Sequence, residues 1–354
     1  MNHAIEADNL VKTFKGKRQV RALDGVSFAV EEGTVFGLLG PNGSGKTTAV
    51  RVLTTILRQD GGQARVLGHD VQKQAALVRT LIGLAGQYAA VDENLTGREN
   101  LQMVGNLNHL ERAFVAGRAK ELLAQFDLTD AGDRPLKTYS GGMRRRLDLA
   151  AALVARPTVL FLDEPTTGLD PQSRNDLWEV IEQLVGGGTT VLLTTQYLEE
   201  ADRLASTLAV LDHGKVIAEG TPASMKADLG ATVLEVGLSS VEDARRTGAI
   251  LDTIGPHTAL VNGTVVEVTV DNGPQAAMVG LRALDGESII PTTFNLREPS
   301  LDDVFLSLTG HRTEEEEEER DGTGDHDIEN PSGRRRRRMR QAEQALPVVT
   351  GERP

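Results

Sequence analysis

The sequence predicts an α/β domain with a parallel sheet, followed by a smaller α+β domain and a disordered, charged tail. Three observations support this fold class. Short apolar runs alternate with helical, charge-containing stretches up to about residue 220. From residue 221 to about residue 310, apolar and polar residues alternate as in half-buried strands. Beyond residue 310, blocks of like charge replace the apolar residues. We therefore expect three regions, at residues 1–220, 221–310 and 311–354.

The apolar runs of the first region are rich in Val and Leu and are bounded by Gly or polar residues. Such runs are typical of strands that are buried in a parallel sheet, with helices as the crossover connections. The predicted strands lie at residues 35–39, 158–162, 190–194 and 209–211.

In the second region we expect the order strand, helix, strand, strand, helix, strand, which is that of a small ferredoxin-like unit. Ser300, followed by Asp303, is typical of a helix start and leads into a helix at residues 301–308. The region carries no catalytic motif, so it could regulate, dimerise or stabilise the first region. The predicted strands lie at residues 232–238, 264–270 and 288–296, and the helices at 241–254 and 274–284.

Composition excludes several classes of function. The chain has no cysteine, which excludes disulfides, zinc–thiolate sites and thiol catalysis. A net charge of -13 disfavours non-specific binding to nucleic acid, and we expect no nucleic-acid partner. No run of 18 apolar residues occurs, so we expect no membrane-spanning helix. The first residues lack the pattern of a signal peptide, so we expect none. The acidic block 314–319 and the basic block 334–338 predict disorder in the tail, unless the arginines contact anionic lipid or a partner.

A phosphate-binding loop is predicted at residues 40–47, which fit the pattern G-x-x-x-x-G-K-[ST]. An apolar run precedes the loop and a helix-like stretch, 47–57, follows it, as this motif requires. Backbone N–H groups and the helix N-terminus would bind phosphate oxygens. Lys46 would add a full charge near the terminal phosphates, and Thr47 would offer its hydroxyl to Mg²⁺. The candidate nucleotide-binding residues here are Gly40, Pro41, Asn42, Gly43, Ser44, Gly45, Lys46, Thr47 and Thr48.

Two carboxylates, Asp163 and Glu164, follow the apolar run at residues 158–162. The end of a strand in a parallel sheet opens onto the ligand crevice. Asp163 is therefore placed to hold Mg²⁺, directly or through water. Glu164 is the candidate for orienting the attacking water, because phosphoryl transfer depends on positioning. The alternative is a strand end with two surface acids, which the phosphate-binding loop disfavours.

Ser140, Gly141 and Gly142 precede a basic, helix-forming segment at residues 143–153. Their N–H groups and the helix dipole would form a second anion site. Lying between a phosphate-binding loop and an Asp-Glu strand, they resemble the signature motif of ATP-binding cassette (ABC) ATPases. The resemblance implies a P-loop NTPase fold of the ABC ATPase type with a helical subdomain, and ATP and Mg²⁺ as cofactors.

Further motifs of that family occur in the expected order. Phe14 resembles the aromatic residue that stacks on adenine, with a buried core Phe as the alternative. Gln87 matches the glutamine that contacts Mg²⁺ and reports to the membrane subunit. Asp170 matches the loop that reaches across a dimer. Gln196 replaces the usual switch histidine; its amide can bond to the γ-phosphate but cannot carry a proton near neutral pH.

Residues 86–88 with 92–97, residues 194–202 and residues 301–305 resemble the ATPase subunits of daunorubicin/doxorubicin-type antibiotic-resistance exporters. The resemblance implies an ATPase that is peripheral to the cytoplasmic face of the cell membrane and powers drug efflux through a separate membrane permease. Each chain carries only one half of a complete ATP site, which implies a head-to-tail homodimer. In it, the phosphate-binding loop of one copy holds ATP and the signature motif of the other copy closes on it. Gln87 and the helical segment at residues 95–126 are the expected coupling surface.

Three alternatives stay open at this point. The cargo could be lipid, polysaccharide or haem, since the permease largely chooses it. The chain could be a non-transport ABC ATPase, although a single cassette without coiled-coil insertions disfavours this. It could also be an interaction protein with a relict ATP site, which the intact Lys46, Asp163 and Glu164 disfavour.

Overall fold

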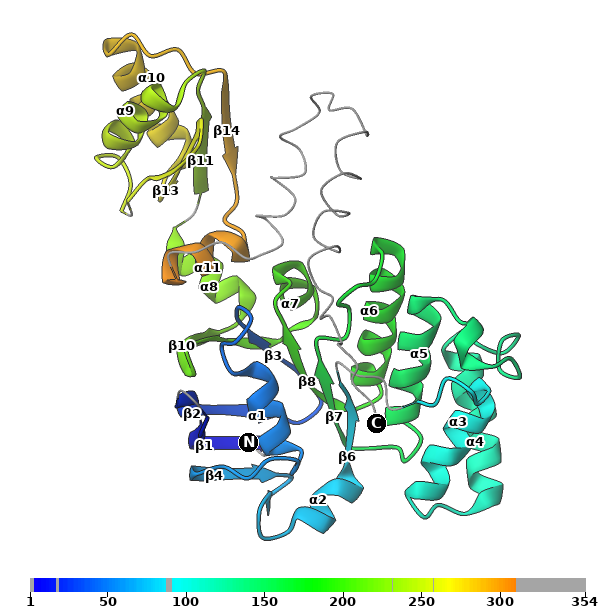
Figure 1. Ribbon diagram of the computed structural model, residues 1–354. Coiled ribbons are helices and arrows are strands. Elements are labelled where there is room, and N and C mark those ends of the chain that lie inside the picture. Colours follow the sequence, from blue (N-terminus) through cyan, green and yellow to red (C-terminus); the bar gives the residue numbers. More distant parts are fainter. Residues whose placement is uncertain (1–2, 17–18, 87–90, 231, 257, 310–354) are drawn as a thin grey trace, which may run out of the picture. The chain divides into compact units, whose positions relative to one another are not determined.

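Two β-sheets lie in the first part of the chain (Figure 1). The computed structural model describes residues 3–16, 19–86, 91–230, 232–256 and 258–309. The strands are β1 (His3–Phe14), β2 (Val20–Glu31), β3 (Val35–Leu39), β4 (Gly61–Val66), β5 (His69–Asp70), β6 (Ile82–Ala85), β7 (Val159–Asp163), β8 (Thr190–Thr195), β9 (Thr207–Asp212) and β10 (Lys215–Gly220). The larger sheet has the order β10-β9-β3-β8-β7-β6 and is parallel from β9 to β6. The smaller sheet, β2-β1-β4-β5, is antiparallel.

The predicted parallel strands are confirmed as β3, β7, β8 and β9. Strand β7 shows why an unbroken apolar run is their signal. Val159 and Phe161 point into one hydrophobic core, whereas Leu160 and Leu162 point into another. Since successive side chains of a strand alternate between faces, a strand that is covered on both sides needs apolar residues throughout.

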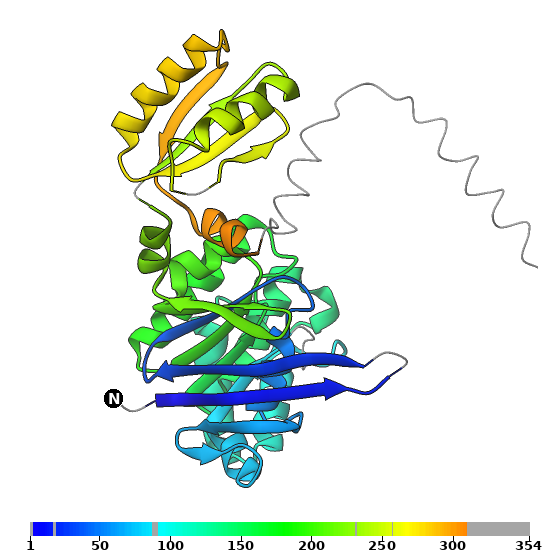
Figure 2. The ribbon, with the colours of Figure 1, turned by 90° about the vertical axis from the view of Figure 1, so that its left-hand side faces the viewer.

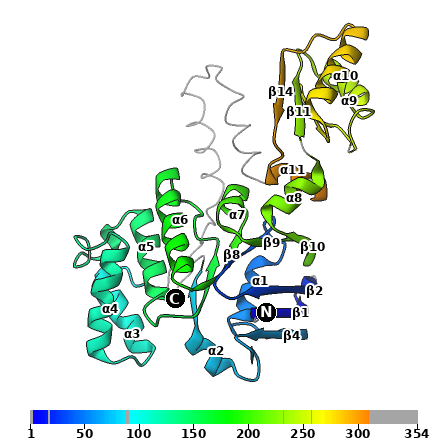
Figure 3. The ribbon, with the colours of Figure 1, turned by 180° about the vertical axis from the view of Figure 1, so that it is seen from behind.

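Helices cover the larger sheet and connect its strands. They are α1 (Lys46–Leu53), α2 (Ala75–Leu81), α3 (Gly97–Leu107), α4 (Arg112–Gln125), α5 (Gly141–Ala152), α6 (Pro171–Gly186) and α7 (Leu198–Leu204). One core lies where α3, α4, α5 and α6 pack on the sheet, and these helices group together on one side in Figures 1 and 3. The other core lies between the larger sheet, α1 and the antiparallel sheet, which faces the viewer in Figure 2.

Two features of this part differ from the sequence-based expectation. The helix expected at residues 47–57 ends at Leu53, because Thr55 adopts a left-handed conformation with φ 66°. The antiparallel sheet was not predicted. Its strands β1 and β2 pair through several register shifts, each of which displaces the apolar and polar alternation.

A third, antiparallel sheet has the order β12-β13-β11-β14. Its elements run in the order strand, helix, strand, strand, helix, strand, so the ferredoxin-like topology is confirmed. The last strand starts later than the expected residue 288; Ser288 has φ 57° and Pro291 lacks an N–H for a sheet hydrogen bond. The elements are β11 (Thr232–Gly237), α9 (Val241–Leu251), β12 (Leu260–Asn262), β13 (Val265–Val270), α10 (Gly273–Gly286) and β14 (Thr293–Arg297).

The expected helix at residues 301–308 is α11 (Leu301–Thr309). Ser300 and Asp303 cap it reciprocally: Asp303 N–H donates to Ser300 Oγ at 3.2 Å, and Ser300 N–H donates to Asp303 Oδ2 at 2.7 Å. Leu301, Val304 and Phe305 pack with apolar residues of α7 and of α8 (Pro222–Leu229). This apolar cluster attaches α11 to the helix that follows the strand β8.

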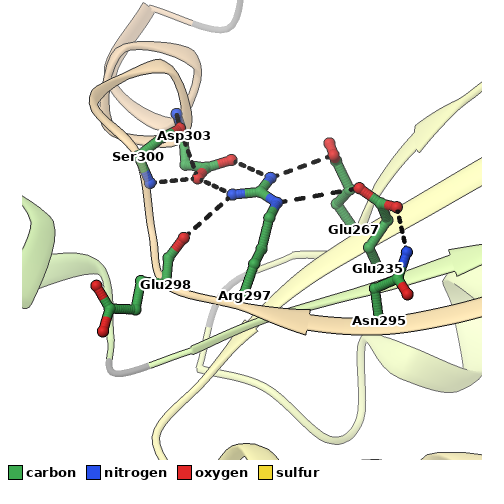
Figure 4. A network of polar contacts seen from close by, with 7 residues as sticks. All are labelled: Glu235, Glu267, Asn295, Arg297, Glu298, Ser300 and Asp303. Atoms are coloured by element: carbon green, nitrogen blue, oxygen red, sulfur yellow. Dashed lines mark hydrogen bonds and ion pairs between the residues drawn. The ribbon is translucent and has the colours of Figure 1, made fainter. Parts of the chain in front are cut away.

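Arg297, at the end of β14, joins the third sheet to α11 (Figure 4). Its guanidinium donates two hydrogen bonds to Asp303, of 2.6 and 2.8 Å, and one of 3.3 Å to Glu267. Glu235 lies 3.9 Å from Arg297 Nε and pairs across the strands with Glu267. One arginine therefore neutralises part of the charge of three neighbouring carboxylates.

The division of the chain at residue 220 stays a prediction, and the expected tail at residues 311–354 lies outside the described residues. Within the described ranges, none of the helices combines the length and the apolar character that crossing a membrane would require.

Candidate functional site

The loop between β3 and α1 carries the predicted phosphate-binding residues at the carboxyl edge of the larger sheet. Three of its glycines have positive φ: Gly40 at 159°, Gly43 at 81° and Gly45 at 115°. A Cβ atom on Gly45 would collide with the carbonyl oxygen of Ala22 in β2. Only glycine therefore allows the loop to curl closely against β2.

Lys46, the first residue of α1, is almost fully buried inside the curl of the loop. Its ammonium donates hydrogen bonds to the carbonyl oxygens of Gly40 at 2.6 Å and Pro41 at 3.1 Å. Glu164 Oε1 lies 3.4 Å from the same ammonium. The structure thus brings the predicted phosphate ligand and the predicted water-positioning carboxylate into one site.

The loop encloses a hydroxyl group that suits an anion. Ser44 is 2% exposed, and its Oγ has no hydrogen-bond partner among the described residues. Burying an unpaired hydroxyl is unfavourable, so a hydroxyl in this place fits a bound phosphate oxygen. A cavity of about 300 Å³ opens beside the loop. It is lined by Ala22, Asn42, Gly43, Gly45, Lys46, Thr47, Thr48 and Glu164.

Asp163, the last residue of β7, is buried next to the loop. Its Oδ1 accepts hydrogen bonds from Thr47 Oγ1 at 3.2 Å and from Thr194 Oγ1 of β8 at 2.6 Å. A carboxylate and a hydroxyl at this separation are the hard oxygen ligands that Mg²⁺ prefers. The donor set therefore fits the expected metal, and it combines residues far apart in the sequence because β3, β7 and β8 end at one sheet edge.

Glu164 has a left-handed backbone conformation, with φ 50°. Its N–H donates to the carbonyl oxygen of Thr194 at 3.0 Å, and its carbonyl oxygen accepts from Arg145 Nη2 at 3.1 Å. A non-glycine residue in this region of φ costs free energy and persists where its surroundings hold it on several sides. The backbone turn at Glu164 is fixed in this way, and it directs the carboxylate toward Lys46.

Ser140, Gly141 and Gly142 lie at the N-terminus of α5. Ser140 is its N-cap and accepts a hydrogen bond from Met143 N–H at 3.2 Å. None of the three lines the cavity beside Lys46. Asp170 caps α6 in the same manner, accepting from Ser173 N–H at 3.0 Å, and this hydrogen bond is the main cause that lowers the pKa of Asp170. Gly141 instead lines a second cavity, of about 230 Å³, that Glu164 also lines. Within one chain, therefore, the described signature residues do not reach the cavity beside the phosphate-binding loop.

Three further predicted residues have different outcomes. Phe14 ends β1 and is 41% exposed, with Lys12 Nζ 5.8 Å from its ring centre, so it is a surface aromatic and not a core residue. Gln196 follows β8 directly and is half-buried. Gln87, predicted to contact Mg²⁺, lies outside the described residues.

Two residues of the site were missed from the sequence. Thr194 contacts both members of the acid pair, and Arg145 bonds to the turn that contains Glu164. Thr194 is one of several threonines in a strand, and Arg145 is one of three consecutive arginines. The sequence carries no signal that separates either from its neighbours; their roles depend on chain crossings that bring distant residues together.

Comparison with known proteins places this chain in a family. Residues 23–167 match the family described as ABC transporter. The chain is 54% identical over 314 residues to the daunorubicin resistance ATP-binding protein DrrA2 of Streptomyces coeruleorubidus, covering 88% of this chain and 97% of that protein. It is 50% identical to the daunorubicin/doxorubicin resistance ATP-binding protein DrrA of Streptomyces peucetius, covering 88% of this chain and 94% of that one.

Among solved structures, an ATP-binding cassette of an ABC transporter in its ADP conformation matches with a TM-score of 0.56 and 28% identity, over 62% of this chain and 92% of that chain. The fold, the phosphate-binding loop and the near-complete coverage of the relatives agree. The chain belongs to the ATP-binding, ATP-hydrolysing subunits of ABC transporters.

Proposed function

We propose that the cavity beside Lys46 binds the phosphates of ATP and that Glu164 positions the water that attacks the γ-phosphate. The observation that carries this proposal is the 3.4 Å separation of Lys46 Nζ and Glu164 Oε1 at the mouth of the phosphate-binding loop. When the γ-phosphate takes over the contact with the ammonium, the carboxylate lies beside it. A carboxylate there can accept a hydrogen bond from water and hold it in line for attack.

Thr47 and Asp163 are the residues that would hold Mg²⁺. Among the described residues no three His, Asp or Glu side chains form a metal-binding group. A hydroxyl and one carboxylate, with phosphate and water completing the shell, are the usual form of a nucleotide-linked Mg²⁺ site. The ion would neutralise charge that develops on the phosphate oxygens.

The second half of each ATP site would come from another copy of the chain. Ser140 and Gly141 stand at a helix N-terminus that does not line the cavity beside Lys46. A helix N-terminus binds anions through free N–H groups and its dipole. In a head-to-tail homodimer this end of α5 would face the γ-phosphate that the partner copy holds, with Asp170 beside the interface and Phe14 against adenine.

The names of the relatives support a proposal for the cargo and the membrane partner. Those named above are daunorubicin and doxorubicin resistance proteins. We infer that this chain powers efflux of a drug of that type through a separate permease, at the cytoplasmic face of the membrane. Gln87 and the segment at residues 95–126 remain the proposed coupling surface.

ATP turnover by the purified chain with Mg²⁺ tests the site. Lys46→Ala should abolish nucleotide binding, because it removes the positive charge that would neutralise the terminal phosphates. Glu164→Gln should keep ATP binding but lower kcat by about 100-fold or more, the usual contribution of a catalytic base. Normal turnover by Glu164→Gln would remove Glu164 from its role.

The cargo needs a separate measurement. With the permease in lipid vesicles, daunorubicin should raise the ATPase rate, and the Lys46→Ala variant should show no response. An unchanged rate with daunorubicin would leave the proposed ATPase function intact but would contradict the drug cargo. The cargo would then belong to another class, such as a lipid or a polysaccharide.

A further inference from the structure

Arg145, in the second turn of α5, has a largely buried guanidinium whose every N–H group finds an acceptor. Nε donates to the carbonyl oxygen of Pro165 at 2.5 Å, and Nη1 donates to that of Gly86 at 2.6 Å and to Asp148 Oδ2 at 3.2 Å. Nη2 donates to the carbonyl oxygens of Asp163 at 3.4 Å and Glu164 at 3.1 Å.

These acceptors belong to three separate parts of the site. Asp163 ends β7 and is followed by Glu164 and Pro165 in the turn after this strand. Gly86 follows β6 immediately before Gln87, and Asp148 lies in α5 itself. The guanidinium itself belongs to α5, the helix that begins at the signature residues. A planar group with five fixed donors holds its acceptors in one relative geometry, which a flexible ammonium does not.

We propose that Arg145 is a positioning residue, which fixes the turn of Glu164 to the signature helix so that the water-positioning carboxylate and the Ser140 end of α5 move as one unit. The left-handed backbone of Glu164 is unfavourable by itself and persists only where hydrogen bonds hold it. Strand β8 accepts from its N–H, and Arg145 donates to its carbonyl oxygen. In the proposed dimer, Glu164 serves the nucleotide of its own copy and α5 the nucleotide of the partner, so this link connects the two ATP sites.

If Arg145 has this role, its replacement should change turnover but not nucleotide affinity. Arg145 does not line the cavity beside Lys46, and its hydrogen bond to Asp163 goes to the backbone carbonyl and not to the carboxylate oxygen that Thr47 contacts. Nucleotide affinity should therefore stay the same. Turnover should fall, because a displaced carboxylate positions water poorly, and a displacement of about 1 Å can reduce a rate by roughly 100-fold.

The experiment compares Arg145→Gln and Arg145→Lys with a matched control, Arg156→Gln. Arg156 is an exposed arginine beyond the end of α5 that pairs with Glu121 at 3.3 Å and lies 5.4 Å from the centre of the Phe114 ring. For each purified full-length variant, kcat, KM and the affinity for a fluorescent ATP analogue are measured below the onset of thermal unfolding. We expect kcat to fall by at least roughly 10-fold in both Arg145 variants, with affinity within about two-fold, and no change in the control.

A second measurement separates positioning from simple loss of structure. The inference rests on the proposed role of Glu164, so Arg145→Gln is also made in a Glu164→Gln background. If Arg145 acts through Glu164, it should lower kcat strongly in the native chain and hardly at all in that background. Equal effects in both backgrounds, a normal kcat, full recovery with Lys, or a loss of nucleotide affinity equal to the loss of kcat would each overturn the inference. Unchanged turnover by Glu164→Gln alone would instead refute the proposed function.

Discussion

At the scale of single residues, the site depends on backbone conformations that few side chains tolerate. Gly45 and Gly43 both have positive φ, but they differ in their surroundings. A Cβ on Gly45 would meet the Ala22 carbonyl and Leu23, whereas a Cβ on Gly43 would meet nothing within 4 Å. Replacing each glycine by alanine therefore distinguishes two costs. At Gly43 only the left-handed backbone is unfavourable, whereas at Gly45 the added Cβ also collides with its neighbours.

Gly43→Ala should lower the free energy of unfolding by about 1–2 kcal/mol, the usual cost of a left-handed alanine. Gly45→Ala should cost more and should also abolish ATP binding, because the loop has to leave β2 to accommodate the methyl group. Urea unfolding and ATP-analogue binding of both variants give the comparison. Equal losses of stability and of binding in the two variants would show that the loop accommodates the extra methyl group at Gly45 without moving away from β2.

Glu200, in α7, is a carboxyl whose charge the fold disfavours. It is completely buried, and its Oε1 accepts a hydrogen bond from Trp178 Nε1 at 3.0 Å. Burial is the largest cause of its raised pKa, against hydrogen bonds and the charge of Arg174, which act in the opposite direction. The folded state therefore holds a proton that the unfolded state releases above its ordinary pKa of 4.5.

It follows that Glu200 contributes most to stability below pH 4.5 and loses this contribution as pH rises toward the raised pKa. Glu200→Gln cannot ionise, so its stability relative to the native chain should improve as pH rises, by at most about 1.4 kcal/mol per pH unit. Thermal unfolding of both proteins between pH 5 and pH 8 checks this. A difference in Tm that stays constant across that range would contradict it.

At the scale of elements, the Arg297 cluster determines how α11 is attached to the third sheet (Figure 4). The hydrogen bonds from Arg297 and Ser300 lower the pKa of Asp303 even though burial, the largest single influence, acts to raise it. Arg297→Met would leave Glu235, Glu267 and Asp303 facing one another. Like charges that are paired across strands destabilise a sheet.

We expect Arg297→Met to lower the free energy of unfolding by about 2 kcal/mol, less than the roughly 3–5 kcal/mol for a fully buried pair, since the arginine is partly exposed. Adding Glu267→Gln should restore part of the loss. Because the folded pKa of Asp303 is lowered, its contribution exists above its ordinary value of 3.8 and disappears as pH falls below it. Arg246→Met, in an exposed ion pair, is the control and should change stability by less than about 1 kcal/mol.

The elements also show how far sequence patterns reach. Strands β3, β7 and β8 were predictable because both of their faces are buried, so their apolar runs are unbroken. The antiparallel sheet was not, because bulges interrupt its pattern. The phosphate-binding loop and the acid pair were found through spacing that the chemistry itself requires. Arg145 was not, since its acceptors are backbone carbonyls, and these leave no mark on the sequence.

At the scale of the whole molecule, one parallel sheet edge collects the phosphate-binding loop, the acid pair and Gln196, while the signature residues stand outside the cavity. If two copies complete each other's sites, defects in different halves should complement. Lys46→Ala disables one half and Ser140→Arg the other. Each variant alone should lack ATPase activity.

A mixture of the two variants should regain activity, because a heterodimer contains one site built from an intact Lys46 and an intact Ser140. ATPase measurements at a series of mixing ratios, with a maximum near equal amounts, would support the composite site. The matched control mixes Lys46→Ala with Gly45→Ala, both of which disable the same half, and should show no maximum. A flat response in the first mixture would refute the head-to-tail arrangement.

The chain contains a single tryptophan, Trp178, and it lies in α6 with its indole N–H bonded to Glu200 of α7 and the Arg203 guanidinium 5.0 Å from its ring. Helix α7 starts just after Gln196. Any displacement of α7 changes both the hydrogen bond and the positive charge beside the indole. The protein consequently carries its own optical probe: the wavelength and intensity of its ultraviolet emission should follow the segment after Gln196 through a catalytic cycle, in real time and without an attached dye.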